Sequence, residues 1–178
     1  MMKRQATAFA LAALLLLLLS PVAHASVESI CKTITKKDPT GIVYLFCVKT
    51  LKSIIPEIDA VNVRGLAFIA TKLSSIQATH VTEKIEELLK SSQDKAEKES
   101  LSTCNKQYSN LIDNLDSALS AIKESRKDDA VKNLSSSAEA PRDCEKAFKD
   151  TGAMSPLAVE DGVQRFLSAI ALGITKLI

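Results

Sequence analysis

The chain has 178 residues and carries 23 Lys and Arg against 21 Asp and Glu, a formal charge of +2. Nucleic acids and anionic lipid surfaces select proteins with an excess of basic residues, so this near balance argues against either as a partner.

Residues 1–25 have the three parts of a secretory signal peptide. Lys3 and Arg4 form a basic start, an apolar run of about 14 residues follows, and Ala23-His24-Ala25 fits the small-x-small cleavage rule. A membrane anchor is the alternative, but a spanning helix needs roughly 20 apolar residues, and Pro21 follows this run closely. We therefore expect cleavage after Ala25 and secretion to the extracellular space.

Cleavage would leave 153 of the 178 residues, with 21 basic and 21 acidic side chains because Lys3 and Arg4 are lost. A chain of that length forms one domain of ordinary size and buries roughly 70% of its unfolded surface. Secretion places the four cysteines where disulfides persist. The disulfides would therefore supplement a hydrophobic core and not replace one.

Residues 26–55 are predicted to form a small N-terminal extension. Cys31 and Cys47 are each eight positions from Pro39, inside the turn sequence Asp38-Pro39-Thr40-Gly41. The apolar run from Ile42 to Val48 fits either a strand or a buried helical turn. So short a segment buries too little surface to hold a hairpin shape unaided, and we expect a local crosslink to fix it.

Residues 56–178 show the periodicity of four long helices, of which the first two are the most regular. The first follows Pro56 and spans Asp59 to Leu89; its apolar stripe is Leu66, Ile69, Leu73, Ile76, Ile85 and Leu88. His80 continues this stripe and is expected to be partly buried at the edge of the core. The second spans about Lys95 to Ile122, with the stripe Leu101, Cys104, Tyr108, Leu111, Leu115, Leu119 and Ile122.

The third helix is predicted from a cap and a smaller, more polar stripe, and the fourth from its N-terminal signals and a well-filled apolar stripe. Asp128 or Asp129 can cap the third, which runs to Phe148 and should be kinked by Pro141. Ser155 and Pro156 suit the N-cap and first position of the fourth helix. Its expected buried face is Val159, Val163, Phe166, Ile170, Ile174 and Leu177.

No segment alternates with period two over a useful length, and the connections of about five to seven residues suit antiparallel neighbours. We therefore predict an all-α fold. It is an up-down-up-down four-helix bundle over residues 56–178, preceded by the extension at 26–55.

The turns select one of the three possible disulfide pairings. If the second and third helices are antiparallel about a turn near Glu124, Cys104 and Cys144 each lie twenty residues from the pivot, side by side and roughly 30 Å away from it. Cys31 and Cys47 straddle their own turn in the same way. The predicted disulfides are Cys31–Cys47 and Cys104–Cys144.

The sequence offers little for catalysis. The mature chain has one histidine, no GxSxG, no glycine-rich phosphate loop and no cysteine left over after two disulfides. The neighbouring carboxylates Asp128-Asp129 and Glu160-Asp161 point about 100° apart on a helix and so do not form a catalytic dyad. We therefore expect no enzyme activity, no metal and no cofactor.

Asn133-Leu134-Ser135 is an N-glycosylation sequon in a chain that we expect to be secreted. It falls inside the third predicted helix, where the geometry is poor for an acceptor. Asn133 is thus a possible site of glycosylation.

Three segments resemble the plant invertase and pectin methylesterase inhibitor family. They are CKTITKKDPTGIVYLFCVKTL (31–51), CNKQYSNLIDNL (104–115) and CEKAFKDTGAMSPL (144–157). The order of signal peptide, close cysteine pair, distant cysteine pair and Ser-Pro-Leu is specific in combination. Within the family, the chain is most similar to the branch that includes tree-pollen allergens described as invertase inhibitors.

The resemblance implies an all-α four-helix bundle with a disulfide-clasped N-terminal helical hairpin, and the same two cysteine pairs. It also implies a protein partner: members bind a secreted carbohydrate-active enzyme in the plant apoplast or cell wall and block its active-site cleft. In pectin methylesterase inhibitors the contact is made largely through the faces of bundle helices.

The family's invertase inhibitors have a Pro-Lys-Phe motif between the second and third bundle helices, where this chain reads Lys127-Asp128-Asp129. An acidic turn favours pectin methylesterase as the target, with acid invertase as the alternative and a secreted signalling or carrier protein as a distant one. The expected partner contacts are exposed side chains of the helices and of this turn: Lys84, Glu87, Asp113, Asp116, Lys127, Asp128, Asp129 and Lys132.

Overall fold

The computed structural model describes residues 26–54 and 62–178, so the predicted signal peptide lies outside it. The helices of the described residues are α2 (Val27–Ile34), α3 (Ile42–Ile54), α4 (Val63–Ser91), α5 (Lys95–Lys123), α6 (Lys127–Ser137), α7 (Ala140–Thr151) and α8 (Ala158–Thr175). No strand occurs among these residues. None of these helices combines the length and the apolar character needed to cross a membrane.

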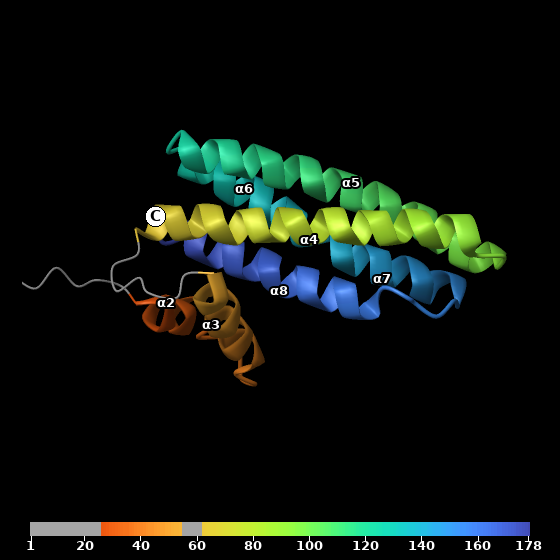
Figure 1. Cartoon of the computed structure of the whole chain (residues 1–178), viewed down its shortest axis with the longest axis horizontal. Coiled ribbons are helices and arrows are strands. Elements are labelled where there is room, and N and C mark those ends of the chain that lie inside the picture. The colour runs from red at the N-terminus through yellow and green to blue at the C-terminus, as the bar shows by residue number, and fades with distance from the viewer. Residues whose placement is uncertain (1–25, 55–61) are drawn as a thin grey trace, which may run out of the picture.

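The bundle consists of four rods: α4, α5, the pair α6 and α7, and α8. Figure 1 shows them lying side by side. α4 packs against α5 and α8, and α5 packs against both α6 and α7, which together form the third rod. α6 and α7 complete the ring by contacting α8. The chain runs up and down the bundle in sequence order, so the predicted all-α four-helix bundle is confirmed.

Side-chain caps fix the starts of α4 and α5. Asn62 Oδ1 accepts the backbone N–H of Arg64 at 2.9 Å, and Asp94 Oδ1 accepts that of Glu97 at 2.7 Å. The first rod therefore begins at Val63; the predicted start at Asp59 lies outside the described residues.

The predicted stripe of α4 is wrong at two positions. Ile76 is 57% exposed, and His80 is exposed instead of lying at the edge of the core. The buried face consists mainly of smaller residues one or two positions away, including Ala67, Ala70, Thr71, Ser74, Ser75 and Ala78. Small side chains let neighbouring helices approach closely, which turns the bulky stripe toward the edge of the interface.

The third rod is two helices and not one kinked helix. α6 ends at Ser137, and α7 begins at Ala140 with Pro141 in its first turn. Pro141 has no N–H to donate to the carbonyl four residues earlier, and the serines before it are weak helix formers. The predicted caps are also wrong: Asp128 and Asp129 lie inside the first turn of α6, whose N-cap position is Arg126.

The predicted buried face of α8 is only partly correct. Ile170 and Ile174 are buried, but Val159 is 76% exposed and Leu177 is 42% exposed. The helix begins at Ala158, two residues after Pro156. Polar side chains occupy core positions instead: Gln164 Nε2 donates to Ser74 Oγ at 2.7 Å.

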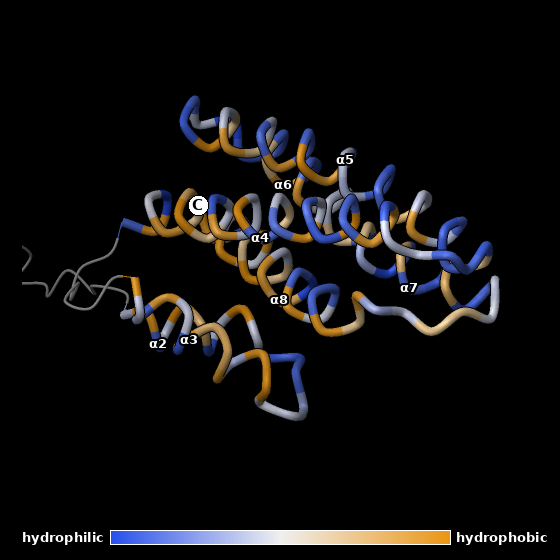
Figure 2. The backbone as a smooth tube through the Cα atoms, turned by 45° about the vertical axis from the view of Figure 1, so that its right-hand side comes forward, coloured by the Kyte–Doolittle hydropathy of each residue, from blue (hydrophilic) through white to orange (hydrophobic). Residues whose placement is uncertain are grey.

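The N-terminal extension is a helical hairpin that packs on α8. The run from Ile42 to Val48 is helical, which resolves the choice left open by its sequence. Asp38 in the turn accepts the backbone N–H of Val43 at 2.8 Å, and Cys31 and Cys47 form a disulfide. The rings of Phe46 and Phe166 lie 5.3 Å apart. Figure 2 shows hydrophobic residues along both the hairpin and α8.

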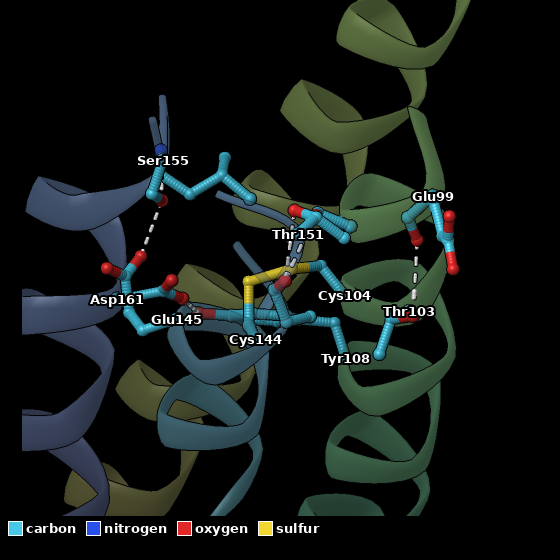
Figure 3. The surroundings of a disulfide bond; sticks show 12 residues. Glu99, Thr103, Cys104, Tyr108, Cys144, Glu145, Thr151, Ser155 and Asp161 are labelled. Atoms are coloured by element: carbon cyan, nitrogen blue, oxygen red, sulfur yellow. Dashed lines mark hydrogen bonds between the residues drawn. A yellow bond between two sulfur atoms is a disulfide. The ribbon is translucent and has the colours of Figure 1, made fainter. Parts of the chain in front are cut away.

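The second disulfide joins Cys104 of α5 to Cys144 of α7, as predicted, and both cysteines are fully buried. Tyr108, one turn beyond Cys104 on α5, is also fully buried beside this bond (Figure 3). The crosslink therefore holds the second and third rods together inside the core.

Candidate interaction surface

An open groove of about 400 Å³ runs between α5 and α6, and every side chain that lines it is polar. Its lining residues are Ser117, Ser120, Arg126, Asp129, Lys132 and Asn133. We call it the α5–α6 groove. Two of the residues predicted to contact a partner, Asp129 and Lys132, lie in it.

Helical spacing brings two further predicted residues to the same side of the molecule. Ser117 and Ser120 line the groove from α5, and Asp113 and Asp116 each lie four residues before one of them. Residues four apart are neighbours on a helix surface. Asp113 and Asp116 are both exposed, so they add two negative charges to this face along α5.

A tight turn closes one end of the groove. Ser125 has a φ of 62°, in the left-handed region, and the N–H of Arg126 donates to the carbonyl of Ala121 at 2.8 Å. The Arg126 guanidinium forms ion pairs with Glu124 and Asp129 on either side. Arg64 of α4 donates to the Ser125 hydroxyl, which ties the first rod to the same turn.

Lys127 and Asp128, side by side in this turn, have different surroundings. Lys127 Nζ donates to the carbonyl of Lys176 at 2.9 Å and to that of Ile178 at 2.8 Å. Its ammonium group is therefore directed toward the end of α8. Asp128 is exposed and lines a second shallow pocket at the turn with Asp129.

Lys84 and Glu87 lie far from this face. Arg64 touches the α5–α6 turn, and Lys84 is twenty residues further along α4, which corresponds to roughly 30 Å of helix. Lys84 is paired with Glu160 of α8. Burial is the largest single influence on the pKa of Glu160 and raises it, but the hydrogen bond from Lys84, the backbone hydrogen bond and the charges of Lys84 and His80 together outweigh burial and lower the pKa overall. The predicted contact residues thus fall on two separate surfaces.

Asn133 lies on the wall of the α5–α6 groove, and its side chain is partly exposed. Its backbone carbonyl accepts the Ser137 hydroxyl at 3.0 Å, as part of the helical structure of α6. The sequon asparagine therefore belongs to the same surface as Asp129 and Lys132.

Sequence reasoning missed three lining residues of the groove, namely Ser117, Ser120 and Arg126. The spacing of Asp113, Ser117 and Ser120 along one helix face was the available signal. Arg126 gave no such signal, because its position depends on the turn. In the part of the chain that the structure describes, no three His, Cys, Asp or Glu side chains are grouped as metal ligands.

The bundle, its clasped hairpin and this polar face can now be compared with known proteins. The family model of the plant invertase/pectin methylesterase inhibitors matches residues 25–174. The chain belongs to this inhibitor family. Proteins named "Putative invertase inhibitor" from Platanus acerifolia and Platanus orientalis are each 30% identical to it, over 93% and 85% of this chain and 92% and 89% of their own length.

Solved structures show the same fold. A mutant form of a pectin methylesterase inhibitor from Arabidopsis superposes with a TM-score of 0.73 at 18% identity, over 85% of this chain and 96% of that one. A pectin methylesterase inhibitor from Arabidopsis thaliana gives a TM-score of 0.63 at 19% identity, over 85% and 94%. At these identities the likeness concerns the fold alone.

Proposed function

We propose that this member of the inhibitor family is a secreted inhibitor of pectin methylesterase that docks its α5–α6 face over the active-site cleft of the enzyme. The observation that carries the proposal is the acidic character of this face. Asp113, Asp116 and Asp128 are exposed, and none of the three forms an ion pair within the described residues.

The charge of this face suits the chemistry of the target. Pectin methylesterase hydrolyses the methyl esters of a polyuronate and leaves a carboxylate at each hydrolysed unit. Its cleft must therefore accept negative charge, and an acidic protein surface is complementary to such a cleft. Complementary charge speeds association and selects against wrong partners.

The rigidity of the bundle supports an inhibitory role. Docking over a cleft requires a preformed surface of about 800 Å² on each partner, and a stiff surface loses little conformational entropy when it binds. The disulfide between α5 and α7, together with the hydrogen bond between Arg64 and Ser125, holds the elements around the groove in place.

Acid invertase is the alternative target, and the names of the Platanus relatives favour it. The turn argues against it. Glycoside hydrolases act through a pair of carboxyl groups, which would repel the exposed carboxylate of Asp128; Asp129 is paired with Arg126. Lys127 precedes Asp128 and Asp129 directly in the sequence, but its ammonium group is bound to the carbonyls of Lys176 and Ile178.

We further propose that the protein acts outside the cell, in the apoplast or cell wall. The signal-peptide pattern of residues 1–25 supports secretion. The two disulfides support it as well, because such bonds persist in oxidising compartments.

Inhibition assays with charge-reversal variants test the proposal. Purified mature protein is titrated into pectin methylesterase and acid invertase assays, and D116K and D128K are compared with E87K, which makes the same charge change on the remote surface. We expect stoichiometric loss of pectin methylesterase activity with the unmodified protein. The double variant D116K/D128K should inhibit at least about tenfold more weakly, and E87K should match the unmodified protein.

Three results would count against the proposal. Inhibition of invertase alone would establish the alternative target. Inhibition of neither enzyme at micromolar protein would favour the signalling or carrier interpretation. Equal loss of inhibition in E87K and in the double variant would show that the α5–α6 face is not the docking surface. Added salt should weaken inhibition if charge complementarity drives docking.

A further inference from the structure

A carboxyl group is buried where three rods of the bundle meet. Asp161, in the first turn of α8, is only 1% exposed. The hydroxyl of Tyr108, from α5, is fully buried and donates to Asp161 Oδ1. Asp161 Oδ2 is also buried, and it has no donor among the described residues.

A second carboxyl group lies beside it. Glu145 of α7 is half-buried, and its carboxyl group lies beside that of Asp161. Glu145 Oε1 accepts the hydroxyl of Ser155, from the loop between α7 and α8, at 2.5 Å. Figure 3 shows the two carboxyl groups together, with Tyr108 and Ser155 on opposite sides of the pair.

Two carboxylates cannot hydrogen-bond to one another unless one of them holds a proton, because an ionised carboxylate is an acceptor only. Asp161 Oδ1 is used by Tyr108, so Oδ2 is the free atom that can carry the proton and donate it to Glu145. Protonation thereby gives a partner to the one oxygen of Asp161 that lacks a donor.

We propose that Asp161 is protonated in the folded protein, and that this shared proton links α8 to α7 and, through Tyr108, to α5. The link would act as a proton-dependent clamp on the bundle, because removing the proton places two adjacent negative charges in the core. This inference rests on the fold and does not depend on the proposed function.

The surroundings of Asp161 support a neutral acid. The pKa of Asp161 is raised to about 8. Burial is the main cause, and a hydrogen bond with Glu145 and the charges of Glu145 and Glu160 act in the same direction. The hydrogen bond from Tyr108 lowers it, and a position in the first turn of a helix also favours the ionised form. On α4, Lys84 is paired with Glu160, and the charge of His80 also lowers the pKa of Glu160.

The proton link gives the stability of the fold a definite dependence on pH. In the unfolded chain Asp161 releases its proton near pH 3.8, the ordinary pKa of an aspartate, whereas the folded protein holds the proton up to about pH 8. Between these values the folded state binds more protons than the unfolded state, so stability falls as pH rises. A difference of one proton changes the unfolding constant by up to about tenfold per pH unit.

The test compares D161N with D116N in urea unfolding between pH 5 and pH 9. Asparagine keeps the shape and the donor of the protonated acid but does not titrate, and Asp116 is an exposed carboxylate on α5. We expect the free energy of unfolding of the wild type and of D116N to fall as pH rises across this range. D161N should lack this part of the pH dependence and should be more stable than the wild type at pH 9. A slope in D161N equal to that of the wild type would overturn the proposal.

Carbon-13 NMR of the wild-type carboxyl groups gives an independent answer if D161N does not fold. The Asp161 carboxyl signal should titrate well above the range of exposed aspartates. In E145Q its midpoint should move to lower pH, because a neighbouring negative charge has been removed. An Asp161 signal that titrates near pH 3.8, the ordinary pKa of an aspartate, in the folded wild type would overturn the proposal.

Discussion

Gly173 of α8 lies directly against Ile34 at the end of α2. A Cβ atom placed on Gly173 would be 2.9 Å from the Cβ of Ile34 and 3.2 Å from its Cγ2. Real Cβ atoms essentially never approach so closely, and the Cβ of Ile34 cannot move without its backbone. The missing side chain at position 173 therefore lets the hairpin dock on α8.

The first prediction compares two glycines of the same helix. G162A should stabilise the protein by about 0.5–1 kcal/mol, because alanine is the better helix former and nothing lies within 4 Å of its Cβ. G173A should destabilise it by about 1–3 kcal/mol because of overpacking against Ile34. Urea unfolding measures both values, and tryptic cleavage near Lys36 and Lys37 reports release of the hairpin. Equal stabilisation by the two substitutions would refute the close approach.

The two disulfides should contribute differently. Cys104–Cys144 joins residues 40 apart, and in the chain-entropy model closing this loop stabilises the fold by about 4 kcal/mol. Cys31–Cys47 joins residues 16 apart and stabilises it by about 3 kcal/mol. C104A/C144A should therefore lower the global unfolding free energy. C31A/C47A should mainly expose the hairpin to protease while α4 to α8 stay folded. Loss of the whole bundle in C31A/C47A would contradict this division.

Removing the cation of the Lys84–Glu160 pair should weaken the protein near neutral pH only. The pKa of Glu160 is lowered in the folded state. The contribution of the pair to the free energy of unfolding is therefore present above pH 4.5, the ordinary pKa of a glutamate, and is lost as pH falls through the lowered pKa. K84M should destabilise by about 0.5–1 kcal/mol at pH 7, the range of pairs that water screens, and by much less near pH 3. K146M breaks the exposed pair with Asp150 and serves as the control, with little change expected at either pH. An equal deficit for K84M at both pH values would argue against the assignment.

The bundle could be predicted from the sequence because its two longest helices, α4 and α5, have strong periodicity. The disulfides could be predicted because each cysteine pair lies symmetrically about a turn. Helix α8 was harder to interpret because it packs against several neighbours, namely α4, the third rod formed by α6 and α7, and the hairpin. Phe166 faces the hairpin, whereas Gln164 and Ser168 face α4. A stripe drawn through all its apolar residues therefore mixes two faces.

Buried polar residues are the second reason why part of the structure could not be predicted from the sequence. The burial of Asp161 could not be predicted, because nothing local indicates that Tyr108, 53 residues earlier, donates to it. Similarly, the α5–α6 groove depends on a turn that places Arg126 opposite Ser117 and Ser120. Partners that are distant in sequence decide which polar side chains are buried and which form a surface, and one sequence does not reveal them.

The last prediction concerns the sequon on the wall of the α5–α6 groove. A glycan on Asn133 would project from the surface that carries Asp129 and Lys132, and it would prevent close docking of an enzyme there. S135A removes the acceptor sequence but keeps Asn133. Made in a host that glycosylates, S135A should inhibit at least as strongly as the wild type; made in bacteria, the two should be equal. Mass spectrometry of the intact proteins shows which wild-type molecules carry a glycan. Full inhibition by glycosylated wild-type protein would move the docking surface away from this groove.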